Sequence, residues 1–314
     1  DDTPPETTAG LYGDLGTGGW YVSEVTVNLT ATDDMSGVNA TWYRVDGGDW
    51  TEFTEAFDVT GEGSHTVEFY SDDLLGNVET AHSVSFDIDT VDPESGHAID
   101  ADDGENGWYT SSATVTLSGS DDTSGLADIM YRVDGDVWAP YSGAFDVEGD
   151  GSHTVEFYAV DEAGNEEALH VVDVNIDATA PDVEYVVIGV NVTLSATDHM
   201  SGVDSIMYRI DGGAWQAYTG MVTVTGTVGN HTVEFYAVDE AGNDGVVGSV
   251  VVAVPPEDTD DDDDDGGLST LALVGIGLLA LAVIAVLVLV LFFKRKGKPA
   301  GKGEEASPPP PEDL

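Results

Sequence analysis

The chain repeats itself three times, and this repeat limits what it can fold into. Pro5, Pro93 and Pro181 lie 88 residues apart, and Trp20 and Trp108 each lie in a GWYVS or GWYTS stretch. The third copy is 11 residues shorter, because matching positions beyond the missing piece are only 77 residues apart in copies two and three. A self-similar period of this length predicts three small tandem domains, each of which builds its own core.

The pattern within each copy is that of β-structure. In the second copy, residues 113–120 (ATVTLSGS) alternate apolar and polar side chains, as a half-buried strand does. Residues 128–133 lead into Asp134-Gly135, a dipeptide that favours a tight hairpin. Residues 152–160 and 170–176 read as further strands. Many short strands with frequent turns in fewer than 90 residues indicate a β-sandwich or a barrel, and we favour the sandwich.

Four linked motifs recur in all three copies: D-x-x-SG, YR[VI]DG with a Trp six residues after the Arg, HTVEFY, and GN. Together they resemble the short Ig-like repeat of prokaryotic surface proteins, a family named after a leptospiral outer-membrane protein. The resemblance covers roughly residues 20–254, and it implies surface adhesion or stalk architecture without enzymatic activity. The first copy departs from the pattern, since it has SDDLLGN where the others have AVDEAGN.

The charge of the chain is strongly one-sided. It has 61 acidic residues against eight Lys and Arg, and it has no cysteine. The first 267 residues carry 57 of the acidic residues but only three basic ones, a formal balance of −54. An excess of negative charge this large excludes nucleic acid as a partner. Because molar salt screens repulsion between exposed carboxylates, we expect a salty exterior, and we hypothesise a halophilic or marine archaeal source.

A 26-residue stretch without charge, residues 268–293, predicts one transmembrane helix. A basic cluster, Lys294 to Lys298, follows it directly, and an aspartate run, Asp260 to Asp265, precedes it. Since cytoplasmic flanks are enriched in Lys and Arg, the N-terminal bulk is expected outside the cell and the C-terminal tail in the cytoplasm. The sequence has no visible signal peptide, so we expect it to be a mature form or a fragment.

Two acidic turns in each copy are the chief candidates for chemistry. Carboxylate and amide oxygens of this kind suit Ca²⁺, although Asp and Asn also stabilise plain turns through their own backbone. The candidate calcium ligands are Asp33, Asp34, Asp72, Asp73 and Asn77 in the first copy, Asp121, Asp122, Asp161 and Asn165 in the second, and Asp198, Asp239 and Asn243 in the third. No other cofactor is expected.

Other recurring side chains have weaker functional readings. Trp50, Trp138 and Trp215 follow the hairpin turn, where they either pack against the sheet or stack on a carbohydrate. For the recurring histidines, His65, His153 and His231, we expect a packing or strand-entry role. For the three recurring arginines we expect an ion pair or stacking on a neighbouring aromatic ring. Sequons, which mark candidate glycosylation sites, begin at Asn28, Asn39, Asn191 and Asn230. No nucleophile motif is present, so we expect no catalytic residues and no enzyme.

These observations predict an all-β protein of three Ig-like or fibronectin-like sandwich modules with one C-terminal transmembrane helix. The expected parts are module 1 (residues 1–92), module 2 (93–180), a shortened module 3 (181–254), an acidic linker (255–267), the helix (268–293) and a basic, Pro-rich tail (294–314). The predicted function is that of a non-enzymatic, membrane-anchored stalk or adhesion protein, whose partners are a cell-surface protein or polysaccharide. The alternative is an extracellular module that binds polysaccharide or Ca²⁺, and the short tail disfavours a signalling receptor.

Overall fold

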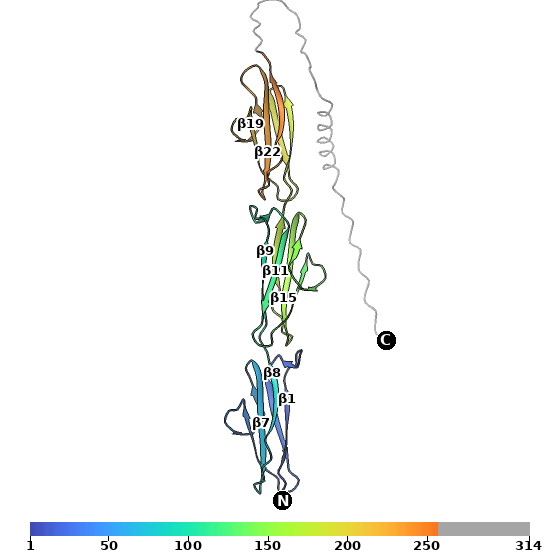
Figure 1. The fold of residues 1–314 in the computed structure, drawn as a ribbon, viewed down its shortest axis with the longest axis vertical. Coiled ribbons are helices and arrows are strands. Elements are labelled where there is room, and N and C mark those ends of the chain that lie inside the picture. The colour runs from blue at the N-terminus through green and yellow to red at the C-terminus, as the bar shows by residue number, and fades with distance from the viewer. Residues whose placement is uncertain (257–314) are drawn as a thin grey trace, which may run out of the picture. The chain divides into compact units, whose positions relative to one another are not determined.

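The computed structural model describes residues 1–256, which fold into three modules in succession (Figure 1). Every regular element in this range is a β-strand, which confirms the all-β prediction for the described part of the chain. No helix within these residues is long and apolar enough to cross a membrane. The predicted transmembrane helix and tail lie outside the described residues.

Module 1 consists of two sheets. One has the strand order β1-β3-β6, and the other has the order β2-β8-β7-β4-β5. All neighbours are antiparallel except β2, which pairs in parallel with β8. The strands are β1 (Glu6–Tyr12), β2 (Trp20–Tyr21), β3 (Val25–Thr32), β4 (Val38–Val45), β5 (Thr51–Glu52), β6 (Phe57–Val59), β7 (Gly63–Asp73) and β8 (His82–Ile88).

Module 2 repeats this topology strand for strand, with sheets β14-β11-β9 and β10-β16-β15-β12-β13. Its strands are β9 (Glu94–Asp100), β10 (Trp108–Tyr109), β11 (Ala113–Ser120), β12 (Leu126–Val133), β13 (Ala139–Pro140), β14 (Phe145–Val147), β15 (Gly151–Asp161) and β16 (His170–Ile176). The strands expected at 113–120 and 170–176 have the expected bounds. Those expected at 128–133 and 152–160 are slightly longer in the structure.

Module 3 has one strand fewer. Its sheets are β17-β18-β21 and β20-β19-β22-β23, so it lacks a counterpart of β2 and β10. This is where the third copy is shorter: β17 turns directly into β18 through Gly189 and Val190. The strands are β17 (Asp182–Ile188), β18 (Asn191–Thr197), β19 (Val203–Ile210), β20 (Gln216–Ala217), β21 (Val222–Thr223), β22 (Gly229–Asp239) and β23 (Gly248–Val254).

Each module encloses its own hydrophobic core between its two sheets. In module 2, Val115 and Leu117 of β11 meet Val155 and Phe157 of β15, and all four side chains are buried. Equivalent clusters fill modules 1 and 3. The alternation along these strands places every second side chain in the core, as the sequence pattern predicts. Each module is therefore a β-sandwich.

Candidate metal centres at the module boundaries

Consecutive modules contact each other through a docking loop and through the linker. In module 1 the loop of residues 13–19 reaches module 2, where the amide of Thr17 donates to the carbonyl oxygen of Ala163 at 2.7 Å. The Thr17 hydroxyl donates to the carbonyl oxygen of Glu162 at 2.6 Å. The equivalent loop of module 2, residues 101–107, reaches module 3 in the same way. Both boundaries therefore use one docking geometry.

The second boundary reproduces these hydrogen bonds with a different side chain. The amide of Glu105 donates to the carbonyl oxygen of Ala241 at 2.8 Å. The side-chain amide of Asn106 donates to the carbonyl oxygen of Glu240 at 2.8 Å. Module 3 has no such loop, because the missing residues are replaced by the turn at Gly189.

Two glycines permit the close approach of the docking loops. A Cβ atom on Gly16 would lie 2.1 Å from the carbonyl oxygen of Ala163, and one on Gly104 would lie 2.6 Å from that of Ala241. Both distances are too short for non-bonded atoms. Glycine is therefore required at these positions for docking.

Three carboxylates meet at the boundary between modules 1 and 2. Asp89 follows β8, Asp121 follows β11, and Asp161 ends β15, and one oxygen of each lies within 4.8 Å of the others. Asp89 and Asp161 are buried, and Asp121 is half-buried. A group contributed by the linker is thus brought against two turns of the following module.

Backbone and side-chain donors fix the orientation of these three carboxylates. Asp89 accepts hydrogen bonds from the amide of Ser124 at 2.9 Å and from that of Val91 at 3.1 Å. Asp121 accepts from the amide of Gly125 at 2.8 Å, as an Asx turn does. Asp161 accepts from the side-chain amide of Asn165 at 2.8 Å. The same Asn165 nitrogen also donates to the carbonyl oxygen of Asp89, so it connects the turn to the linker.

The arrangement occurs three times in residues 1–256. Asp177, Asp198 and Asp239 form the group at the boundary between modules 2 and 3, and Asp1, Asp33 and Asp73 form the one at the start of module 1. In each group the linker aspartate accepts a hydrogen bond from a serine amide, that of Ser36, Ser124 or Ser201, at 2.9 Å.

Each of these groups concentrates negative charge, and at least one of its carboxylates is buried. The chain has no lysine before residue 294, and its three arginines in the described range pair with other acids. Burial raises the pKa of Asp73, but hydrogen bonds from Asn77 and Ser36 outweigh burial, and the net pKa lies well below its ordinary value. Asp73 is therefore ionised in the folded protein. A cation is the natural counter-charge for such a group.

The donor chemistry fits a hard divalent cation. Ca²⁺ takes six to eight oxygen ligands and tolerates irregular geometry, whereas zinc and copper favour nitrogen and sulfur. Three carboxylates supply three to six oxygens, and backbone carbonyls and water supply the rest. Such an ion would join the linker to the following module, and it would neutralise most of the charge.

The structure brings some of the sequence-predicted calcium ligands together and leaves others out. Asp33 with Asp73, Asp121 with Asp161, and Asp198 with Asp239 share a group in each module. Asn77, Asn165 and Asn243 lie beside the groups and donate through their nitrogens to the carboxylates. Asp34, Asp72 and Asp122 are not members of any group.

The sequence analysis missed the linker aspartates Asp1, Asp89 and Asp177. A signal for them existed, because the three are spaced by the same 88 residues as the prolines that follow them. They lie outside the two turns, in the segment that leads into each module, so the turn motifs do not include them.

The recurring arginines make the contacts expected of them. Arg132 donates from Nε and Nη2 to the two carboxylate oxygens of Glu156 at 2.7 and 2.8 Å. Its guanidinium carbon lies 4.6 Å from the centre of the Trp138 ring. Modules 1 and 3 have the same pair of contacts, Arg44 with Trp50 and Arg209 with Trp215. One face of each recurring tryptophan is thus covered by an arginine.

The recurring histidines hold hairpin turns, as their expected strand-entry role implies. In module 2, His153 Nδ1 lies 2.8 Å from Asp134 Oδ2, and its Nε2 lies 3.0 Å from the carbonyl oxygen of Gly149. The hydrogen bond to Asp134 raises the pKa of His153, and its partner's pKa is lowered. His65 and His231 make the equivalent contacts.

The four sequon asparagines differ in exposure. Asn39 and Asn230 are exposed, whereas Asn28 and Asn191 are half-buried. Asn39 Nδ2 donates to Asp72 at 2.7 Å, and Asn191 Oδ1 accepts from Thr223 at 2.9 Å. Glycosylation at the four sites stays a prediction, and Asn230 is the most accessible candidate that makes no such side-chain bond.

No protein-family model matches the sequence, and no curated protein matches it. Among solved structures, the chain is similar to fibronectin(III)-like modules of CbhA from Clostridium thermocellum, with 16% identity and a TM-score of 0.29 over 55% of this chain and 100% of that one. It is also similar to a tetra-tandem repeat in the extending region of a large adhesion protein, with 20% identity and a TM-score of 0.30 over 79% of this chain and 74% of that one. A third similar structure is that of a 1.5-MDa bacterial ice-binding adhesin, with 15% identity and a TM-score of 0.32 over 81% of this chain and 98% of that one. TM-scores this low do not assign the fold, which is defined by the sheets and cores of the chain itself.

Proposed function

We propose that the protein is a non-enzymatic cell-surface protein, anchored in a membrane by residues 268–293, whose acidic modules form a stalk or adhesive region outside the cell. The observation that carries the proposal is the repeated docking of one module on the next, which suits a spacer made of identical units. A member of the Ig-like surface repeat family would have this role.

The distribution of charge supports the proposed topology. The basic residues cluster after residue 293, and the modules before it carry carboxylates with no lysine. A basic flank marks the cytoplasmic side of a single-pass helix. The acidic surface of the modules suits a salty exterior, where it is screened.

Protease treatment of intact cells tests the topology. We expect added protease to remove an epitope tag placed before residue 1 and to leave a tag placed after residue 314 intact. Lysed cells, in which both tags are cut, serve as the control. Loss of the C-terminal tag alone from intact cells would reverse the topology and overturn the proposal.

A second candidate function is binding of Ca²⁺ at the module boundaries. It is favoured by three groups of three carboxylates, each joining a linker aspartate to two turns. An ion there would couple the linker to the following module, and it would stiffen the array. Isothermal titration of Ca²⁺ into the chelator-treated protein is expected to give saturable heat, which falls when Asp89 and Asp177 are both changed to Asn. Absence of heat in the wild-type protein would remove this candidate.

A further inference from the structure

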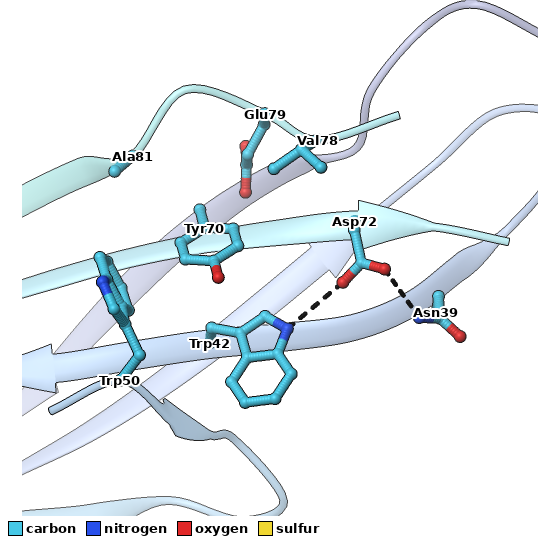
Figure 2. A pocket seen from close by; sticks show the side chains of 8 residues that line it. All are labelled: Asn39, Trp42, Trp50, Tyr70, Asp72, Val78, Glu79 and Ala81. Atoms are coloured by element: carbon cyan, nitrogen blue, oxygen red, sulfur yellow. Dashed lines mark hydrogen bonds between the residues drawn. The ribbon is translucent and has the colours of Figure 1, made fainter. Parts of the chain in front are cut away.

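Module 1 has a groove on the outer face of its larger sheet that carries aromatic and polar groups together. The groove has a volume of about 480 Å³ and is open along the sheet surface. Figure 2 shows the side chains that line it, which include Asn39, Trp42, Trp50, Tyr70, Asp72 and Glu79. They come from β4, β7, the turn after β4 and the segment before β8.

The register of the sheet sets these side chains side by side. Trp42 of β4 lies directly opposite Tyr70 of β7. The Trp50 ring meets the Tyr70 ring edge-on, with ring centres 4.7 Å apart. Asp72 accepts hydrogen bonds from Trp42 Nε1 at 3.3 Å and from Asn39 Nδ2 at 2.7 Å (Figure 2). The result is an aromatic row that ends in a carboxylate and an amide.

The other two modules form the same sheet without this set of groups. Met130 and Met207 lie where module 1 has Trp42, since each is opposite the equivalent tyrosine. At the position of Asp72, modules 2 and 3 have Val160 and Val238. The fold therefore does not require Trp42 or Asp72, and their presence in module 1 calls for another explanation.

The charges around the groove limit the class of ligand. Asp72 and Glu79 disfavour an anion, as does the acidic surface of the modules. A cation would meet the Arg44 guanidinium, which already lies 4.7 Å from the centre of the Trp50 ring. A neutral ligand with an apolar face and a hydroxylated edge avoids both conflicts, because the apolar face packs on an aromatic ring while the hydroxyls bond to amide and carboxylate oxygens.

A sugar ring in a neutral polysaccharide has these properties, and the open surface of the groove suits a chain that lies across it. We propose that module 1 binds a neutral polysaccharide in this groove, with Trp42 as the stacking platform and Asp72 and Asn39 as the hydroxyl-binding groups. This site would give the adhesive role proposed above a ligand. The inference rests on that adhesive role and on no other part of the proposed function. The stalk topology stands or falls separately, on the protease experiment.

Binding is tested with the full chain in a detergent that has no sugar headgroup, produced in a host without N-glycosylation because Asn39 begins a sequon. The probes are neutral glucans, mannans, galactans and xylans on an array, followed by titration calorimetry with any that bind. We expect saturable binding to at least one of them, weakened at least tenfold by Trp42→Met and by Asp72→Val. Both changes install the residue types of the other two modules, so the variants are expected to fold. Met130→Ala, at the same position in module 2, is the matched control, and it should bind as the wild type does.

Three results would overturn the proposal: no saturable binding to any neutral polysaccharide, binding unchanged in both variants, or preferential binding of a quaternary ammonium probe such as choline. Mass spectrometry of peptides from the native protein shows whether Asn39 carries a glycan that could itself occupy the groove. If Asn39 carries a glycan, and free polysaccharide binds only after its removal, the groove holds that glycan instead.

Discussion

Changing Asp89 to Asn distinguishes a cation site from an ordinary turn. Asp89 is fully buried, and its carboxylate has an oxygen within 4.8 Å of oxygens of Asp121 and Asp161. Two unit charges at that distance repel by about 3.5 kcal/mol at an effective dielectric constant near 20. The substitution removes two such repulsions. Because the Asn side chain has only one acceptor oxygen, it keeps one of the two hydrogen bonds from Val91 and Ser124 in weakened form, at about 1 kcal/mol, and loses the other, at about 1–3 kcal/mol. In the presence of chelator, the variant is therefore expected to be more stable than the wild type.

Calcium should narrow this difference, because it stabilises the wild type much more than the variant. A single site filled at 100 times its dissociation constant stabilises the folded state by about 2.7 kcal/mol. For a domain the size of one module, this corresponds to a rise in melting temperature of roughly 10–20 °C. We expect the wild type to show this rise for module 2, and Asp89→Asn to lose most of it. Differential scanning calorimetry of both proteins, each with chelator and with Ca²⁺, measures the melting temperature of module 2 in these four samples.

Asp122→Asn is the matched control for this experiment. Asp122 is exposed, lies next to Asp121 in the same turn, and is not a member of the group. Its substitution should leave the calcium response unchanged. If Asp89→Asn destabilises module 2 equally in chelator and in Ca²⁺, the three carboxylates are structural turn groups, and the reasoning from charge is refuted.

Four further outcomes are expected. Phe157→Ala should lower the unfolding free energy of module 2 by about 3–5 kcal/mol, because the ring is fully buried; a loss below 1 kcal/mol in denaturant titration would mean that the core relaxes. His153→Gln should lower the unfolding free energy by at most about 1 kcal/mol, and the loss should be greatest below pH 6.5. The reason is that the folded state raises the pKa of His153, so the stabilisation is present when His153 is protonated and disappears as pH rises through the folded pKa. Melting curves from pH 5.5 to 9 test this, and a loss of stability that grows with pH would contradict it. Gly104→Ala should release module 3 from module 2 without unfolding either, seen by small-angle scattering as a wider range of conformations, whereas Gly96→Ala, which has no atom near its new methyl, should not. The melting temperature should rise between low and molar salt, and no rise would remove the argument for a salty exterior.

Much of the fold could be predicted from local pattern. The alternation at residues 113–120 and 170–176 gives two strands at their observed bounds, because one face of each is buried and the other is not. The dipeptide Asp134-Gly135 predicts a hairpin, and both residues have positive φ, 51° and 72°. The return strand of this hairpin, expected from Val137 and Trp138, is β13 (Ala139–Pro140), whose two residues are too few to show a periodicity.

The candidate sites were harder to predict, because each depends on contacts between distant parts of the chain. Asp121 and Asp161 lie in turns that recur, but Asp89 lies in the linker outside both turns, and the fold of the chain brings it to them. Recurrence drew attention to Trp50, whereas Trp42 occurs once and becomes notable only when β4 is paired with β7. The transmembrane helix, which the sequence predicts from composition alone, lies outside the described residues and stays a prediction.

The turn at Gly189 gives the array a polarity. Modules 1 and 2 each have a loop that docks on the next module, and modules 2 and 3 each have the surface that receives it, whereas the described part of module 3 has no such loop. Copies of module 2 could be inserted in series, but a sandwich placed behind module 3 would be tethered only by its linker. The position of one short deletion thus sets how many modules dock through this loop, so changing that position would change the number of docked modules without altering any core.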